Sequence, residues 1–191
     1  MNNFNVAILL SGDGQSCQSL IHDKSDKFKV VAVLSSNENA NGLFLASQAK
    51  IECGVFKLAD FSDASQRDLA IVSLLKRLKV NLVVCSGYLG VLTDCFFDKE
   101  NNFDIICSHQ SLFPTLSEKG IKGIKLHQVL IDLHHDESGV TVCYQTDTGP
   151  GDCVCCEKIA IHKSWTAQKL QHEIVQMENR LLRCAVLKIC N

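Results

Sequence analysis

The stretch Asn5-Val6-Ala7-Ile8-Leu9-Leu10-Ser11-Gly12-Asp13-Gly14 decides the fold, because a short apolar run leads directly into a glycine-rich turn. Residues 15–21 follow with helical spacing, so the unit is a strand, a tight turn and a helix. Such a turn places free backbone N–H groups at the start of a helix, where a phosphate is favoured. The turn lacks the Gly-Lys-Ser/Thr ending of a Walker A loop, and Cys17 replaces the third glycine of a dinucleotide fingerprint. The local pattern therefore allows two interpretations, a phosphate-binding turn or a tight connection without a ligand.

Outward from this turn, apolar runs of strand length alternate with helical stripes. We expect strands at 28–34, 51–57, 82–85 and 105–108, and helices at 43–50 and 65–78. The helix at 65–78 ends in basic residues, which suit a helix C-terminus. Strands that alternate with helices predict a parallel sheet that is covered on both faces.

The pattern changes in the last third of the chain. We expect a partly helical stretch at 121–133, strands at 139–144 and 153–161 around a turn at 145–152, and a long helix at 166–187. The turn contains Gly149-Pro150-Gly151-Asp152, a strong turn signal, so the two strands form a hairpin. The predicted fold is therefore α/β, with a Rossmann-like, open and mostly parallel sheet, helices on both faces, and a C-terminal antiparallel hairpin and long helix.

Length and composition indicate one domain over residues 1–191. The hydrophobic share is 46% and the charged share is 21%, as in ordinary globular proteins. A formal net charge of -2 argues against a protein that grips nucleic acid. No apolar run is long enough to span a membrane, and the first residues lack the basic and apolar regions of a signal peptide. We therefore expect a cytoplasmic protein without nucleic-acid or membrane partners.

Eleven cysteines are many for a cytoplasmic protein. Their odd number and the length of the chain argue against a disulfide framework. Cys85, Cys107 and Cys143 fall inside predicted strands, where a thiol acts as a small buried hydrophobe. The stretch Cys153-Val154-Cys155-Cys156 is also interpreted as strand, because a zinc site usually needs two well-spaced ligand pairs and only His162 is near. We therefore expect no metal site.

The stretch Cys107-Ser108-His109-Gln110-Ser111-Leu112-Phe113-Pro114 follows a predicted buried strand. It therefore lies at the carboxyl end of the sheet, where open α/β folds bind ligands. His109 is a candidate general acid or base near neutral pH, and the alternative is a hydrogen-bonded structural histidine. We interpret a second group of polar residues as a solvated helix end rather than a metal site: His127, His134, His135 and Asp136.

Five segments occur in the order that is typical of one family. They are Ile8-Leu9-Leu10-Ser11-Gly12-Asp13-Gly14, Cys85-Ser86-Gly87-Tyr88-Leu89-Gly90-Val91-Leu92, Ser108-His109-Gln110-Ser111-Leu112-Phe113-Pro114, Gly139-Val140-Thr141-Val142 and Glu178-Asn179-Arg180-Leu181. With them the chain resembles, over essentially its whole length, the glycinamide ribonucleotide transformylase (phosphoribosylglycinamide formyltransferase) family of folate-dependent formyltransferases. The resemblance implies transfer of a formyl group from the co-substrate 10-formyltetrahydrofolate to glycinamide ribonucleotide in de novo purine synthesis. It also implies a monomer or homodimer without a metal.

The resemblance further implies roles for individual residues. The ribonucleotide phosphate would bind at Gly12, Asp13, Gly14, Gln15 and Ser16. The folate pocket would be lined by Tyr88, Leu89, Gly90, Val91 and Leu92. Glu178 would contact the ribonucleotide, and His109 would be catalytic. On this basis a phosphate-binding half covers about 1–100, and a folate-binding and catalytic half covers about 101–191.

Four positions depart from the family pattern. Cys107 stands where the family has a catalytic Asn, Pro150 where it has a catalytic Asp, Gln110 where it has a Pro, and Gly90 where it has an Arg. Loss of one donor to a developing oxyanion costs roughly a hundred- to thousandfold in rate, and a thiol is a weak donor. We therefore expect impaired activity, unless Asp147 or Asp152 replaces the missing carboxylate. The alternatives are a non-catalytic paralogue that binds a phosphorylated ligand, and another folate-dependent formyltransferase.

Overall fold

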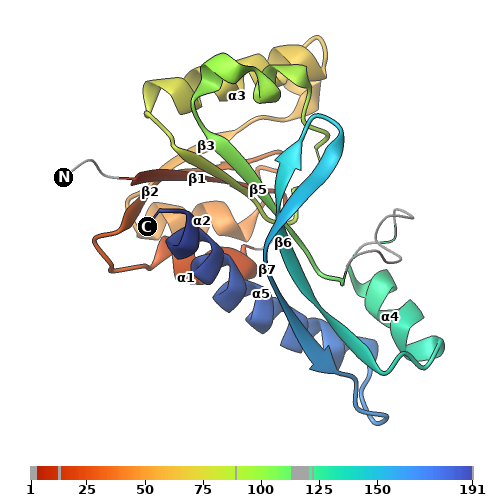
Figure 1. Cartoon of the computed structure of the whole chain (residues 1–191). Coiled ribbons are helices and arrows are strands. Elements are labelled where there is room, and N and C mark those ends of the chain that lie inside the picture. Colours follow the sequence, from red (N-terminus) through yellow and green to blue (C-terminus); the bar gives the residue numbers. More distant parts are fainter. Residues whose placement is uncertain (1–3, 13, 89, 113–120, 122, 191) are drawn as a thin grey trace.

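The computed structural model describes residues 4–12, 14–88, 90–112, 121 and 123–190 of the chain. These residues contain seven strands, β1 (Phe4–Leu10), β2 (Phe28–Ser35), β3 (Glu52–Val55), β4 (Leu82–Cys85), β5 (Asp104–His109), β6 (Glu137–Thr146) and β7 (Gly149–Ala160). Hydrogen bonds join them into one sheet in the order β3-β2-β1-β4-β5-β6-β7 (Figure 1). The first five strands pair in parallel, and β6 and β7 are antiparallel. The predicted sheet with its C-terminal antiparallel hairpin is confirmed.

The strand order reverses at β1. From β1 the chain moves outward through β2 and β3, and then crosses to β4 on the other side of β1. β1 and β4 pair in parallel from Val6 opposite Leu82 to Leu9 opposite Cys85. The chain leaves the carboxyl ends of such neighbouring strands in opposite directions, and open α/β sheets bind their ligands in the crevice that results. The segments that follow β1 and β4 are therefore well placed for a ligand site.

Helices cover both faces of the sheet. They are η1 (Gln15–Cys17), α1 (Gln18–Ile21), α2 (Asn41–Gln48), η2 (Leu58–Asp60), α3 (Ala64–Arg77), η3 (Asp94–Phe97), η4 (Lys99–Asn101), α4 (Ile124–Asp132) and α5 (Ala167–Ile189). α3 and η3 pack on one face, and α1, α2, α4 and α5 pack on the other (Figure 1). Alternate residues of β1 pack into the two helical layers. Ile8 and Leu10 face α5, whereas Ala7 and Leu9 face α3.

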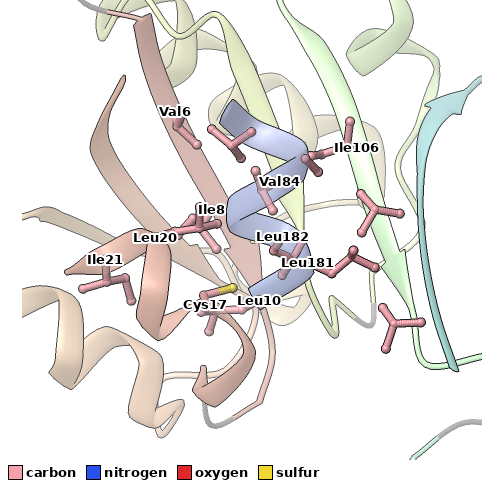
Figure 2. Packing of buried hydrophobic residues seen from close by; sticks show 14 of the residues in the cluster. Val6, Ile8, Leu10, Cys17, Leu20, Ile21, Val84, Ile106, Leu181 and Leu182 are labelled. Carbon is pink, nitrogen blue, oxygen red and sulfur yellow. The ribbon is translucent and has the colours of Figure 1, made fainter. Parts of the chain in front are cut away.

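α5 is a long amphipathic helix whose apolar stripe lies on the sheet. Thr166 caps it by accepting a hydrogen bond from the backbone N–H of Lys169. The predicted stripe is buried and consists of Leu170, Ile174, Met177, Leu181, Leu182 and Ala185. Leu181 and Leu182 pack beside the side chains of β1 (Figure 2). Glu178 lies within the same buried stripe, and a carboxylate in such a place needs hydrogen-bond donors.

The hairpin differs from the sequence prediction in the length of its turn. β6 and β7 extend to Thr146 and Gly149, so that only Asp147 and Thr148 form the turn instead of the whole of 145–152. Gly149 adopts a φ of 122°, and Pro150 pairs opposite Gln145 in the outer strand. The glycines and the proline suggested a long turn, but an edge strand tolerates proline, because its missing N–H breaks no inner ladder.

The histidine group near the end of α4 is only partly a solvated helix end. His134, His135 and Asp136 are exposed, as expected. His127 is fully buried, which corrects that interpretation, because its side chain lies on the packed face of α4 with Leu126 and Leu130. In the described ranges, no three His, Cys, Asp or Glu side chains are grouped to hold a metal ion. A search of the same residues for helices long and apolar enough to cross a membrane found none.

Candidate functional site

A buried carboxylate joins four distant segments of the chain at the carboxyl edge of the sheet. Glu178 of α5 is 2% exposed and accepts hydrogen bonds from Ser16 Oγ at 2.6 Å, Gln110 Nε2 at 2.8 Å and Ser86 Oγ at 3.2 Å. The hydroxyl of Ser108 is a fourth donor. A carboxylate has about four acceptor positions, so these side chains match its capacity. The four donors come from the glycine turn and from the segments that follow β4 and β5.

The sheet register explains why two serines reach the same carboxylate. Cys85 of β4 pairs with Cys107 of β5, so Ser86 and Ser108 come next on neighbouring parallel strands. Successive side chains of a strand point to opposite faces. Ser108 therefore points toward α5, on the same side as its neighbour Ser86, and the thiol before each serine points toward α3.

The glycine turn is held against α2 and α5. Gly14 has a φ of 73°, and a Cβ at this position would lie 2.5 Å from the Cα of Gly42 in α2. Gly12 has open space around it, with no atom within 4 Å of an added Cβ. Ser19 in α1 contacts α5, because its backbone N–H donates to Asn179 Oδ1 at 2.8 Å. Gln15 is exposed, whereas Asp13, also expected in the phosphate site, lies outside the described residues.

A buried ion pair of α3 contacts the backbone at Val91 and Thr93. Arg67 and Asp68 of α3 are 3% and 0% exposed, and Arg67 Nη2 lies 2.6 Å from Asp68 Oδ1. Arg67 also donates to the backbone carbonyl of Val91 at 3.0 Å, and Asp68 accepts from the backbone N–H of Thr93 at 2.8 Å. α3 thereby holds the part of the chain that was expected to line a folate pocket. Of that segment Leu89 lies outside the described residues, and Val91 is 80% exposed.

Tyr88 fills the space beside Gly90. A Cβ at position 90 would lie 2.6 Å from the Tyr88 ring, so the ring occupies the room that a larger residue would need. The Tyr88 hydroxyl is buried and has no hydrogen-bond partner among the described residues. Burial raises the pKa of this hydroxyl to about 12, so it stays protonated near neutral pH.

His109 and Cys107 lie on the same side of β5. His109 is the last residue of the strand, is half-buried, and pairs opposite Thr141 of β6. Cys107 is also half-buried and pairs opposite Cys143. Since alternate residues share a face, the two side chains point away from α5 and toward the opposite layer. The two side chains therefore share one face of β5, and a pairing of the thiol with the imidazole stays a prediction.

A second histidine supports the site from α4. His127 Nε2 lies 3.3 Å from Gln110 Oε1, while the amide nitrogen of the same glutamine donates to Glu178. Burial lowers the pKa of His127 to about 4, so the imidazole is neutral near neutral pH. Gln110 therefore links a neutral buried histidine to a buried carboxylate.

The hairpin carboxylates are remote from His109. Asp147 lies in the turn, six residues along β6 from Thr141, the partner of His109. At about 3.3 Å per residue this is roughly 20 Å along the strand. Asp152 is exposed on β7, and β6 separates that strand from β5. Pro150 is likewise exposed on β7.

Comparison with known proteins decides the family. The profile of the formyl transferase family matches residues 4–186. The chain belongs to the formyl transferase family. It is 28% identical to phosphoribosylglycinamide formyltransferase of Haemophilus influenzae over 180 residues, which cover 92% of this chain and 82% of that protein. It is 25% identical to the trifunctional purine biosynthetic protein adenosine-3 of Bos taurus over 185 residues, which are 95% of this chain and 18% of that protein.

Solved structures of this formyl transferase family share the fold. Phosphoribosylglycinamide formyltransferase from Brucella melitensis superposes with a TM-score of 0.86 at 28% identity, over 99% of this chain and 96% of that one. Glycinamide ribonucleotide transformylase 1 from Geobacillus kaustophilus has a TM-score of 0.85 at 18% identity, over 100% of each chain, and shows the fold alone. The resemblance seen in the sequence is confirmed at the level of the family and its fold.

Sequence reasoning about this family member missed the groups that support the site. The family motifs contain Ser86, Ser108 and Gln110, but the sequence does not predict that they donate to Glu178. A signal existed for the serines, because Ser86 directly follows one predicted strand of the parallel sheet and Ser108 is the last residue of the next. No comparable signal marked Arg67 and Asp68, since charged residues on a helix are usually solvated.

Proposed function

We propose that this formyl transferase moves a formyl group from 10-formyltetrahydrofolate to glycinamide ribonucleotide in de novo purine synthesis. The observation that carries the proposal is the convergence on Glu178 of the glycine turn, the segment after β4 and the His109 segment. The names of the relatives, phosphoribosylglycinamide formyltransferases, support the same reaction.

The ribonucleotide would bind along the crevice between the ends of β1 and β4. Backbone N–H groups of the turn at 12–16 would hold the phosphate. A ribose hydroxyl could replace one serine hydroxyl as a donor to Glu178, since both carry the same chemical group. The phosphate and the ribose would then lie on residues that the structure brings together.

The folate side rests on the segment at 88–92. 10-Formyltetrahydrofolate supplies the formyl group. Tyr88, whose hydroxyl has no hydrogen-bond partner among the described residues, would hydrogen-bond to the folate. His109 would hold a proton for the oxygen that gains negative charge when the amine attacks. The buried Arg67–Asp68 pair would keep the segment in place while both substrates bind.

We further propose that the transfer is slow. Cys107 offers only a weak donor at the position where the family has an amide, and Pro150 has neither a carboxylate nor an N–H. These two positions also favour the second candidate, a non-catalytic paralogue that keeps the fold and binds a phosphorylated ligand. The two candidates share the binding site and differ in turnover.

A formyl-transfer assay with both substrates separates the two candidates. We expect slow turnover by the purified chain and a fall of about a hundredfold or more in His109→Ala. His135→Ala is the control, because this exposed histidine lies beyond the end of α4. Cys107→Asn together with Pro150→Asp should raise the rate. Turnover that is equal in wild type and His109→Ala would refute the catalytic role, and ribonucleotide binding without turnover would establish the paralogue.

A further inference from the structure

Four neighbouring strands carry a cysteine at the same level of the sheet. Cys85 of β4 pairs with Cys107 of β5, Cys107 with Cys143 of β6, and Cys143 with Cys153 of β7. Residues that pair across strands project from the same face, so these thiols form a continuous row. All four are free thiols. The row runs from the buried Cys85 to Cys153, which is exposed at the sheet edge.

Cys85 and Cys107 are direct partners on parallel neighbouring strands, and both side chains lie in the layer that contains α3. Neighbouring strands lie about 4.8 Å apart, and disulfides join Cα atoms that are about 4.4 to 6.8 Å apart. Cys85 is the last residue of β4, and Gly87 follows it with a φ of 61°. The backbone on one side of the pair is therefore a strand end rather than the middle of a ladder.

The two thiols differ in access to solvent. Cys85 is 6% exposed, whereas Cys107 on β5 is half-buried. The neighbouring Cys107 thiol, together with burial, holds the pKa of the Cys85 thiol well above its usual range. Cys107 is thus the thiol that a small oxidant can reach. Cys85 is its buried partner and remains a protonated thiol.

We propose that Cys85 and Cys107 are an oxidative modification site, at which a peroxide converts the two thiols into a reversible disulfide. The thiolate of Cys107 attacks one peroxide oxygen, the O–O bond breaks, and Cys107 becomes a sulfenic acid while hydroxide leaves. The sulfur of Cys85 then attacks the Cys107 sulfur, the S–O bond breaks, and the proton of Cys85 leaves with the oxygen as water. The hydroxide takes up the proton that Cys107 released when it became a thiolate, so two thiols are oxidised and one hydrogen peroxide is reduced to two waters. A small dithiol reverses the reaction by exchange.

The other thiols of the row are poorer partners for Cys107. Cys143 is 2% exposed, and its Sγ points to the backbone oxygen of Cys107 at 3.9 Å. Burial raises the pKa of Cys143 to about 12. Cys153 lies on β7, and β6 separates that strand from Cys107. The disulfide would lie directly behind Ser86 and Ser108, so oxidation would act on the two donors to Glu178.

Peptide mapping tests this site without any substrate, so its outcome is independent of the proposed function. The purified chain is treated with hydrogen peroxide, its remaining thiols are alkylated, and trypsin is added. Cys85 and Cys95 lie on the peptide 80–99, and Cys107 lies on the peptide 100–119. We expect a disulfide-linked pair of these peptides, fragmentation that places the bond at Cys85, and complete loss of the pair after treatment with dithiothreitol.

Cys95→Ala is the matched control, because it removes the other thiol of the same peptide and should leave the link intact. Cys85→Val keeps an apolar side chain in the buried position and should abolish the link. Cys107→Ala should abolish it as well, and this second variant keeps the test decisive if the first does not fold. The proposal is overturned if no link forms, if the link survives in Cys85→Val, or if Cys107 joins the peptide 126–158 that carries Cys143.

Discussion

At the scale of single residues, Glu178 is the group on which the site depends. Its carboxylate is buried in an otherwise apolar stripe and accepts from three serine hydroxyls and the amide of Gln110. Burial of such a charge is tolerated only when donors surround it. The same donors would be left without an acceptor if the carboxylate were removed. Glu178 is therefore both a structural residue and a candidate ligand contact.

Replacement of Glu178 should lower stability in proportion to the acceptors that are lost. Glu178→Leu leaves four donors unpaired, of which Ser86 is buried and the other three are partly buried, and we expect the free energy of unfolding to fall by about 3 kcal/mol or more. Glu178→Gln keeps one acceptor oxygen and should cost about 1 kcal/mol. Urea denaturation measures both values. Glu173→Leu in the same helix is the control, since Glu173 is partly exposed and paired with Lys169. An unchanged urea midpoint in Glu178→Leu would contradict the role of the network.

His127 should make the folded state sensitive to acid. Its pKa falls from the ordinary 6.5 to about 4 because it is buried, so between these values the unfolded chain binds a proton that the folded chain does not. Stability rises with pH wherever the unfolded state holds more protons. The contribution of His127 is therefore present above about pH 6.5 and is lost as the pH falls toward 4.

The size of this effect can be isolated with His127→Gln. From neutral pH to about pH 5 the wild type should lose about 2 kcal/mol more of unfolding free energy than the variant. Urea denaturation at both pH values gives the difference. Equal losses in the two proteins would show that His127 titrates in the folded state as it does in the unfolded chain.

At the scale of elements, the N-terminal unit of strand, turn and helix requires a glycine at position 14, where the turn packs against α2. A Cβ on Gly14 would approach the Cα of Gly42 to 2.5 Å, and the φ of 73° is costly for other residues. We expect Gly14→Ala to lower the free energy of unfolding by about 3 kcal/mol. Gly12→Ala is the matched control, because nothing lies within 4 Å of its added Cβ. Equal denaturation midpoints for the two variants would contradict the tight packing of the turn on α2.

The elements differ in how far the sequence predicts them. The range 82–85 is predicted and observed as a strand, and the stripe of α5 is as expected, because periodicity reports burial directly. The hairpin turn is predicted as eight residues and has two, since Gly149 and Pro150 fit an edge strand as well as a turn. Only the position of β7 at the edge of the sheet resolves that ambiguity, and such a position is a property of the whole sheet.

At the scale of the whole molecule, the site exists because the strand order reverses at β1. Ser16, Ser86 and Ser108 are far apart in the chain, and the sheet brings each of them to Glu178. Local pattern predicts each segment, and the family resemblance predicts which of them serve one ligand. The donor contacts themselves depend on tertiary packing. They follow from the register of β4 and β5 and from the rotation of α5, which no local signal specifies.

Under the proposed function, the whole site combines a binding half with an altered chemical half. The turn, Glu178 and its donors are joined by hydrogen bonds, whereas the family resemblance implies that Cys107 and Pro150 replace two catalytic groups. The Asp147 carboxylate lies about 20 Å along β6 from the level of His109, so it would have to move far to replace the missing one. Ribonucleotide binding is therefore the part of the proposal to test first, and turnover is the second.

Calorimetric titration with glycinamide ribonucleotide tests this central claim most directly. The wild type should bind the ribonucleotide more tightly than the folate, and Glu178→Gln should weaken ribonucleotide binding about tenfold or more, because it removes the charge from the acceptor. Glu173→Gln, a change on the partly exposed part of the same helix, should bind as the wild type does. Binding of the folate without binding of the ribonucleotide would contradict the account.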